Sequence, residues 1–138
     1  MTMRGFRSRF CLVALFLLLM TGTCLAEDME FVDANGATGY YADIDSVSYE
    51  STKEGDTPVT YIYARVSVVR ADDNRRYLYA MQFDPAKSTY RIMASEVQAY
   101  DTKETLEKSA AVELPRRYGP SSPMKEIVDF IMRARPRR

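Results

Sequence analysis

The feature that most constrains this chain is a pair of neighbouring segments in which apolar and polar side chains alternate. Thr60–Arg70 and Arg75–Asp84 are rich in β-branched and aromatic residues and flank the polar loop Ala71–Asn74, as the arms of a β-hairpin would. An even-numbered loop pairs even positions of the first arm with odd positions of the second. That register gathers apolar side chains on one face: Ile62, Ala64, Val66, Val68, Tyr77, Tyr79, Met81 and Phe83. A shift by one residue would scatter this set, so the pattern predicts the register as well as the strands.

The following segment supports the same face independently. Pro85–Ser88 is a second polar loop, and an antiparallel strand after it would continue the sheet. The same pairing rule then gives three further pairs, all apolar or aromatic: Phe83 with Tyr90, Met81 with Ile92, and Tyr79 with Ala94. Three consecutive strands therefore agree on one buried face, which predicts an antiparallel meander.

Shorter strands are expected before this meander. Met29–Asp33 and Tyr40–Ile44 have strand character and are separated by the turn residues Asn35–Gly39, whose glycines can take positive φ. Ser46–Ser51 either continues the second strand or forms a short edge strand. Thr52–Thr57 is expected to be a polar loop.

The C-terminal region predicts one helix. Ser122 is a suitable N-cap and Pro123 a suitable first helical residue, while Pro136 favours an end near Ala134. An apolar stripe follows at helical spacing, with Phe130 on its flank: Met124, Ile127, Val128 and Ile131. The expected fold class is α+β, a twisted antiparallel sheet of about five to six strands with one C-terminal helix packed on one face.

Residues 1–26 have the three parts of a cleavable signal peptide. Three arginines precede the apolar run Phe10–Met20, and the small residue Ala26 ends the segment Cys24–Ala26. The run holds eleven residues, whereas a membrane-spanning helix needs about 20. Cleavage after Ala26 is expected. Two alternatives stay open: an uncleaved tilted anchor, or lipidation at Cys24.

The expected mature chain, residues 27–138, is a single exported domain in the periplasm, on the cell surface or secreted. Removing the leader leaves sixteen basic and nineteen acidic residues, a net charge of −3. It also removes both cysteines, so stability must come from the core rather than from a disulfide. The basic tail, 133–138, is expected to complement the helix dipole and to stay solvated. Contact of the tail with acidic lipid, polysaccharide or nucleic acid is the alternative, and the net charge gives nucleic acid little support.

The residue types that most catalytic and metal sites need are scarce. The chain contains no His, and the expected mature domain contains no Cys, so His-dependent triads, cysteine nucleophiles and ordinary zinc sites are excluded. Asn35–Gly39 lacks the helix and lysine of a phosphate-binding loop. Asp43–Asp45 and Asp72–Asn74 offer too few oxygens for calcium, and the second is typical of a tight turn. We therefore expect a non-catalytic domain with no metal and no cofactor.

The sheet face opposite the apolar set is the candidate binding surface. Tyr, Arg and Met are enriched at protein interfaces, and the predicted register gathers such side chains there: Tyr61, Tyr63, Arg65, Gln82, Arg91 and Met93. The same register places Ser95 and Val97 on this face. The alternative is an ordinary half-wet face, or one covered by the N-terminal strands or by a second subunit.

The order of these parts resembles the surface-adhesin E-like domain family. Tyr40–Val47 is similar to its Tyr-Tyr-x-Asp-x-x-Ser-Ile signature, Tyr79–Ile92 to its central hairpin, and Pro120–Glu126 to the start of its closing helix. Pro85 and Met132 stand at or near two positions where many members have cysteines. The resemblance covers most of the mature chain and implies an exported domain of this fold.

The resemblance also suggests a role. The family is named for an adhesin that binds host matrix and plasma proteins such as vitronectin and laminin. We expect an exported, non-catalytic, adhesin-like binding module that contacts a protein partner through the tyrosine-bearing face or an exposed edge strand. The alternative is an envelope structural or assembly protein that self-associates through the same face.

Overall fold

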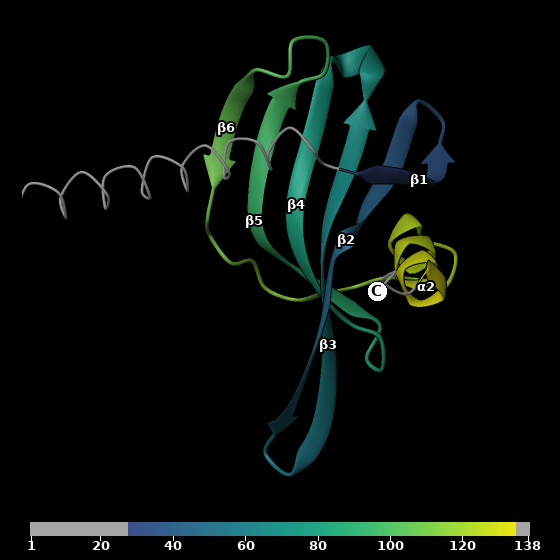
Figure 1. Cartoon of the computed structure of the whole chain (residues 1–138), viewed down its shortest axis with the longest axis vertical. Helices are drawn as coiled ribbons and strands as arrows, with labels where there is room; N and C mark the ends of the chain where they lie inside the picture. The colour runs from purple at the N-terminus through teal and green to yellow at the C-terminus, as the bar shows by residue number, and fades with distance from the viewer. Residues whose placement is uncertain (1–27, 135–138) are drawn as a thin grey trace, which may run out of the picture.

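The computed structural model describes residues 28–134 and forms one antiparallel sheet with a helix against it (Figure 1). Its elements, in chain order, are β1 (Met29–Asn35), β2 (Thr38–Glu54), β3 (Thr57–Arg70), the 3₁₀ turn η1 (Ala71–Asp73), β4 (Arg75–Asp84), β5 (Thr89–Ala99), β6 (Thr105–Ser109), β7 (Arg116–Arg117) and α2 (Pro123–Ala134). The predicted signal peptide, residues 1–26, lies outside the described residues, as do positions 135–138 of the basic tail.

The predicted meander and its single C-terminal helix are confirmed. Strands β1 to β6 neighbour one another in chain order, and β7 pairs with the start of β5. Within residues 28–134 the sheet has seven strands, slightly more than expected. Two strands, β6 and β7, were not predicted: β6 is exposed along its whole length and β7 is two consecutive arginines, so neither shows the alternation of a half-buried strand.

The central register is the predicted one. Ile62 pairs with Phe83, and Phe83 pairs in turn with Tyr90. Ile62, Val66 and Phe83 are at most 2% exposed, so the apolar set does form the core side of the sheet. The alternation of side chains in these strands therefore fixes both the pairing and the buried face.

Helix α2 packs on this core face and lies next to β1 and β2 (Figure 1). Its bounds and cap are those predicted: the Ser122 hydroxyl oxygen accepts the Lys125 N–H at 3.3 Å. Ile127, Val128 and Ile131 are at most 1% exposed and pack in one cluster with the buried residues of β3 and β4. The amphipathic stripe thus attaches the helix to the sheet without a disulfide between the described residues.

Strand β2 is longer than expected, and the predicted loop Thr52–Thr57 is wrong. Ser46–Ser51 continues β2, which then pairs with β3 until Glu54 lies opposite Thr57. Gly55, with φ +63°, and Asp56 form a two-residue turn. The hairpin therefore projects beyond the other strands at the bottom of Figure 1. Both faces of its β2 arm are exposed near the tip, so the polar side chains there gave no sign of a strand.

Strand β5 contains a bulge that the sequence did not reveal. Met81 pairs with Ile92 as predicted, but Ala80 pairs with Ala94, which leaves Met93 without a partner on β4. The predicted pairing of Tyr79 with Ala94 is therefore wrong, and Tyr79 pairs with Ser95 instead. The two residues after Met93 are Ala94 and Ser95, whose side chains are small enough to suit either face, so alternation could not reveal the extra residue.

Two half-buried or buried tyrosines predict an alkaline limit to stability. Burial raises the pKa of both Tyr79 and Tyr118 above the ordinary value of 10.0. The folded chain then keeps these protons at a pH where the unfolded chain loses them. The contribution of these two tyrosines should be constant between about pH 7 and 9, and stability should fall as the pH rises beyond about 10. Urea unfolding across this range checks it, and Tyr79→Phe should show a shallower fall than the parent; an equal slope would contradict the assignment.

Candidate binding surface

The sheet face away from α2, called the far face below, is built by side chains in register. Residues paired across antiparallel strands project to the same side. One row joins Asp43, Arg65, Ala80 and Ala94, and the next joins Tyr41, Ser67, Leu78, Glu96 and Lys108. Five strands therefore contribute to one continuous surface.

A shallow depression of about 410 Å³ occupies the middle of the far face. Leu78, Ala80 and Ala94 contribute apolar side chains to it, while charged side chains surround them: Arg65, Glu96 and Lys108. Two consecutive small residues in the same row, Ala80 and Ala94, leave room above the backbone. An apolar floor with a charged rim is the usual composition of a surface that receives a side chain from a partner.

Glu96, at the rim of this depression, belongs to a polar network. Glu96 accepts hydrogen bonds from the Thr105 hydroxyl and, at 3.2 Å, from the Gln98 amide. Mainly because of the Thr105 hydrogen bond, the pKa of the Glu96 carboxyl is lowered. Glu96 is therefore held in its charged form at neutral pH beside Lys108, its cross-strand partner.

Four of the candidate residues chosen from the sequence lie close together on the far face: Tyr61, Tyr63, Gln82 and Arg91. Tyr63, Gln82 and Arg91 form one row across β3, β4 and β5, and the Gln82 amide donates to the Tyr63 hydroxyl at 2.8 Å. Tyr61, Gln82 and Arg91 also line a second cavity of about 250 Å³ near the β2–β3 hairpin.

Met93, Ser95 and Val97 differ from this pattern. Met93 is the unpaired bulge residue of β5 and is not part of the row. Ser95 and Val97 pair with Tyr79 and Tyr77, so they belong to the core side of the sheet and their predicted place on the far face is wrong. The bulge inverts which face each later residue of β5 takes.

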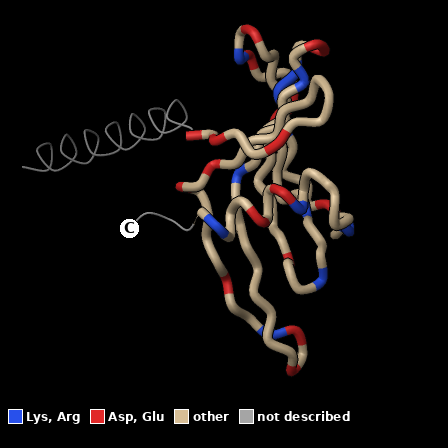
Figure 2. The backbone as a smooth tube through the Cα atoms, turned by 90° about the vertical axis from the view of Figure 1, so that its right-hand side faces the viewer, with Lys and Arg blue, Asp and Glu red and all other residues tan. Residues whose placement is uncertain are grey.

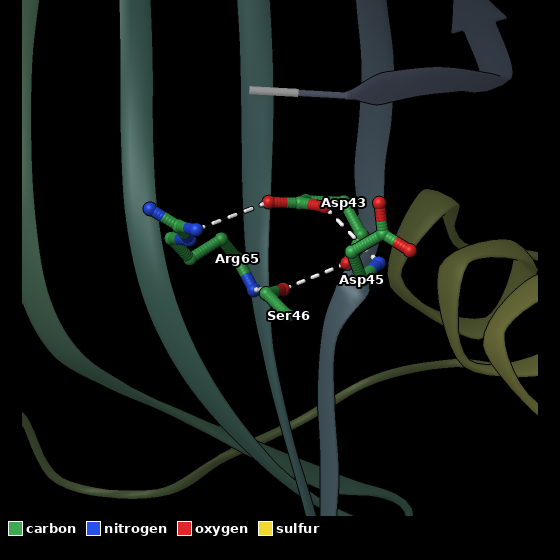
Figure 3. A network of polar contacts seen from close by, with 4 residues as sticks. All are labelled: Asp43, Asp45, Ser46 and Arg65. Carbon is green, nitrogen blue, oxygen red and sulfur yellow. Dashed lines mark hydrogen bonds and ion pairs between the residues drawn. The ribbon is translucent and has the colours of Figure 1, made fainter. Parts of the chain in front are cut away.

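Arg65 has a structural partner, as Figure 3 shows. Its guanidinium lies 3.3 Å from the carboxylate of Asp43, a side chain only 3% exposed. Its backbone N–H donates to the Ser46 hydroxyl at 2.8 Å, and Ser46 donates to the Asp43 carbonyl at 2.7 Å. Asp43 also accepts the backbone N–H of Asp45 at 3.1 Å.

These contacts close a wide bulge in β2. Between the pairs Asp43–Arg65 and Ser48–Tyr63, residues 44–47 oppose the single residue Ala64. The acidic residue and the serine of the Tyr40–Val47 segment therefore fold the backbone onto itself. This explains the Asp43–Asp45 cluster as a backbone brace, and the residues of the second cluster, Asp72–Asn74, form a turn with Asn74 at φ 51°.

Several residues of the surface were missed from the sequence. The Glu54 carboxylate and the Lys87 ammonium lie 3.0 Å apart, and both residues line the second cavity although they are far apart in the chain. Glu96 and Lys108 flank the depression. Each stands alone in a polar stretch, so only the strand register could have placed them, and the register of β5 and β6 depends on bulges.

Both outer edges of the sheet are short or interrupted. Strand β6 has five residues, with a register irregularity next to Val97 and the exposed Lys108. Strand β1 has a similar irregularity between Phe31 and Asp33 and lies against α2. Bulges and lysines of this kind discourage pairing with another chain. The far face is thus a better candidate surface than an edge strand.

The fold and the surface together define a class: a meander sheet with one face packed by a C-terminal helix and the other hollowed above small side chains. Comparison with protein-family models, with curated proteins and with solved structures finds no match. Within residues 28–134, no helix has the length and apolar character that crossing a bilayer requires.

Proposed function

We propose that this chain is an exported, non-catalytic binding module that receives a protein partner on the far face. The observation that carries the proposal is the depression of about 410 Å³ over Leu78, Ala80 and Ala94. Helix α2 packs on the other side of the sheet, so within residues 28–134 no helix covers the far face. The pattern of residues 1–26 supports export, and the resemblance to surface-adhesin E-like domains supports an adhesive role.

The charge distribution supports a protein partner. Figure 2 shows acidic and basic residues interspersed along the described chain, including at the hairpin tip. Such a surface offers local pairs of opposite charge, as between Glu54 and Lys87. Local complementarity of this kind selects a protein partner and fixes its orientation.

Leu78→Lys is expected to weaken partner capture by at least about tenfold, which corresponds to the loss of one good apolar contact. The new ammonium would occupy the apolar floor, and Glu96, the cross-strand partner of position 78, offers it a counter-charge so that folding is retained. The measurement is the Kd of the mature chain for immobilised vitronectin and laminin.

Met132→Lys is the matched control, because Met132 is 49% exposed on α2, in the other layer. It should bind like the parent. Equal affinity of the two variants would refute the proposed surface, and binding of the chain only to itself would favour the assembly role. Sequencing the N-terminus of the chain from fractionated cells checks export, with Glu27 expected first.

A further inference from the structure

The second cavity, near the hairpin tip, is lined by a carboxylate of the protein itself, that of Glu54. This carboxylate is bound by neighbouring side chains in the way that a carboxylate ligand would be. Glu54 accepts a hydrogen bond from the Tyr61 hydroxyl, and its other carboxylate oxygen lies 3.0 Å from the Lys87 ammonium. These two hydrogen bonds, with the charges of Lys87 and Arg91, lower the pKa of the Glu54 carboxyl. The same contact raises the pKa of the Tyr61 hydroxyl to about 12, so it remains a donor at neutral pH.

Arg91 gives the cavity an unused donor. Its Nε is buried and has no hydrogen-bond partner among the described residues. Buried donors are costly to leave unpaired, so this nitrogen is a position where an acceptor would be favourable. Arg91 is one of the residues that line the cavity, so an acceptor bound there would lie next to this side chain.

Glu54 is attached weakly enough to leave. Its side chain is 49% exposed and that of Lys87 is 60% exposed, and ion pairs of such exposure add little stability. Glu54 also lies next to Gly55, at the tip of a projecting two-stranded hairpin. Its departure would disturb no buried packing.

The remaining charges then favour an anion. With Glu54 in place, the lining residues include two carboxylates, Glu54 and Asp84, and two cations, Lys87 and Arg91. Asp84 is fixed, because it is 5% exposed and accepts the Lys87 backbone N–H at 3.3 Å. Without Glu54 the cavity carries a net positive charge and three donors that suit a carboxylate: Tyr61, Lys87 and Arg91.

We infer that this cavity binds a carboxylate of the protein partner, and that Glu54 is a built-in competitor which the partner's acidic group displaces. The inference deepens the proposed function, since it names the chemistry by which the partner is recognised. The cavity volume of about 250 Å³ suits one acidic side chain or a chain terminus rather than a larger ligand.

The test measures the binding of small probes to the mature chain, and the NMR signal of the Arg91 Nε–H reports the binding. N-acetylglutamate α-amide carries only a side-chain carboxylate, N-acetylalanine carries only a terminal one, and N-acetylglutamine amide is the neutral control. Glu54→Gln should bind the preferred acid about tenfold more tightly than the parent, and Arg91→Gln should lose binding. N-acetylglutamine amide, the neutral probe, should bind neither the parent nor Glu54→Gln.

Glu126→Gln is the charge-matched control, because it removes one negative charge from an exposed position on α2. Equal affinities for Glu54→Gln, Glu126→Gln and the parent would overturn the inference. Should Arg91→Gln fold poorly, Lys87→Gln at the exposed position must weaken binding instead. Absence of probe binding while Leu78→Lys still impairs partner capture would sink this inference alone; probe binding with unimpaired capture would sink the proposed far-face function alone.

Discussion

Truncation of Phe83 to alanine should lower the free energy of unfolding by about 3–5 kcal/mol. Phe83 is fully buried and lies between Ile62 and Tyr90 in the sheet. It belongs to the same cluster as Ile127 and Ile131 of α2, so its ring joins the two layers. Since domains of this size are stable by only about 5–15 kcal/mol, the variant should be partly unfolded in mild denaturant. Equilibrium unfolding in urea measures the loss.

Leu114→Ala provides the comparison. Leu114 is 83% exposed, so its truncation should change stability by no more than about 0.5 kcal/mol. If Phe83→Ala were as mild as Leu114→Ala, Phe83 could not be the contact between sheet and helix. Such a result would refute the register of the central strands.

The central strands and the helix could be predicted because both bury one apolar side, and the two apolar sides pack against each other. Ile62 and Phe83 must share a face for the hairpin to bury them, and Ile127 and Ile131 must share a stripe for the helix to cover that face. Periodicity reports burial, so it identifies elements that have a buried side. The cap at Ser122 added a local signal for the helix start.

The hairpin tip and the bulges could not be predicted for the same reason. Thr52–Glu54 belongs to strand β2, but all three of its side chains are exposed, so it has no buried face that alternation could reveal. The extra residue Met93 has neighbours that tolerate either environment. The wide bulge at residues 44–47 is held by the Asp43 carboxylate and the Ser46 hydroxyl, which act on the backbone and leave no periodic pattern.

The candidate surface was therefore predicted in part. The row of Tyr63, Gln82 and Arg91 follows from the pairing of β3 with β4 and of β4 with the first half of β5, and alternation predicts this pairing correctly. The depression lies past the bulge, where Ala94 rather than Met93 pairs with Ala80. Two small residues leave space on the sheet only where they pair across strands. Whether two residues pair follows from the register, and the register of this part of β5 could be read only from the backbone.

Replacement of Arg65 by methionine is expected to lower the free energy of unfolding by about 1–3 kcal/mol, because it leaves a buried carboxylate without its cation. The Asp43 side chain is 3% exposed, whereas that of Arg65 is 51% exposed. Water therefore already solvates part of the guanidinium, which keeps the loss below that of a fully buried pair. The methionine retains most of the apolar stem, so the change isolates the charge.

The double variant Asp43→Asn/Arg65→Met should recover part of this loss, about 1 kcal/mol, although it removes more of the native contacts. An asparagine at position 43 is neutral, and its side-chain oxygen can still accept the Asp45 N–H. Lys87→Met, which breaks the exposed pair with Glu54, should cost no more than about 1 kcal/mol. If Arg65→Met were as mild as Lys87→Met and the double variant were worse than both, Asp43 would not depend on Arg65. The bulge would then be held by the hydrogen bonds of Asp43 and Ser46 without the Arg65 guanidinium, which would be free to contact the partner at the edge of the depression.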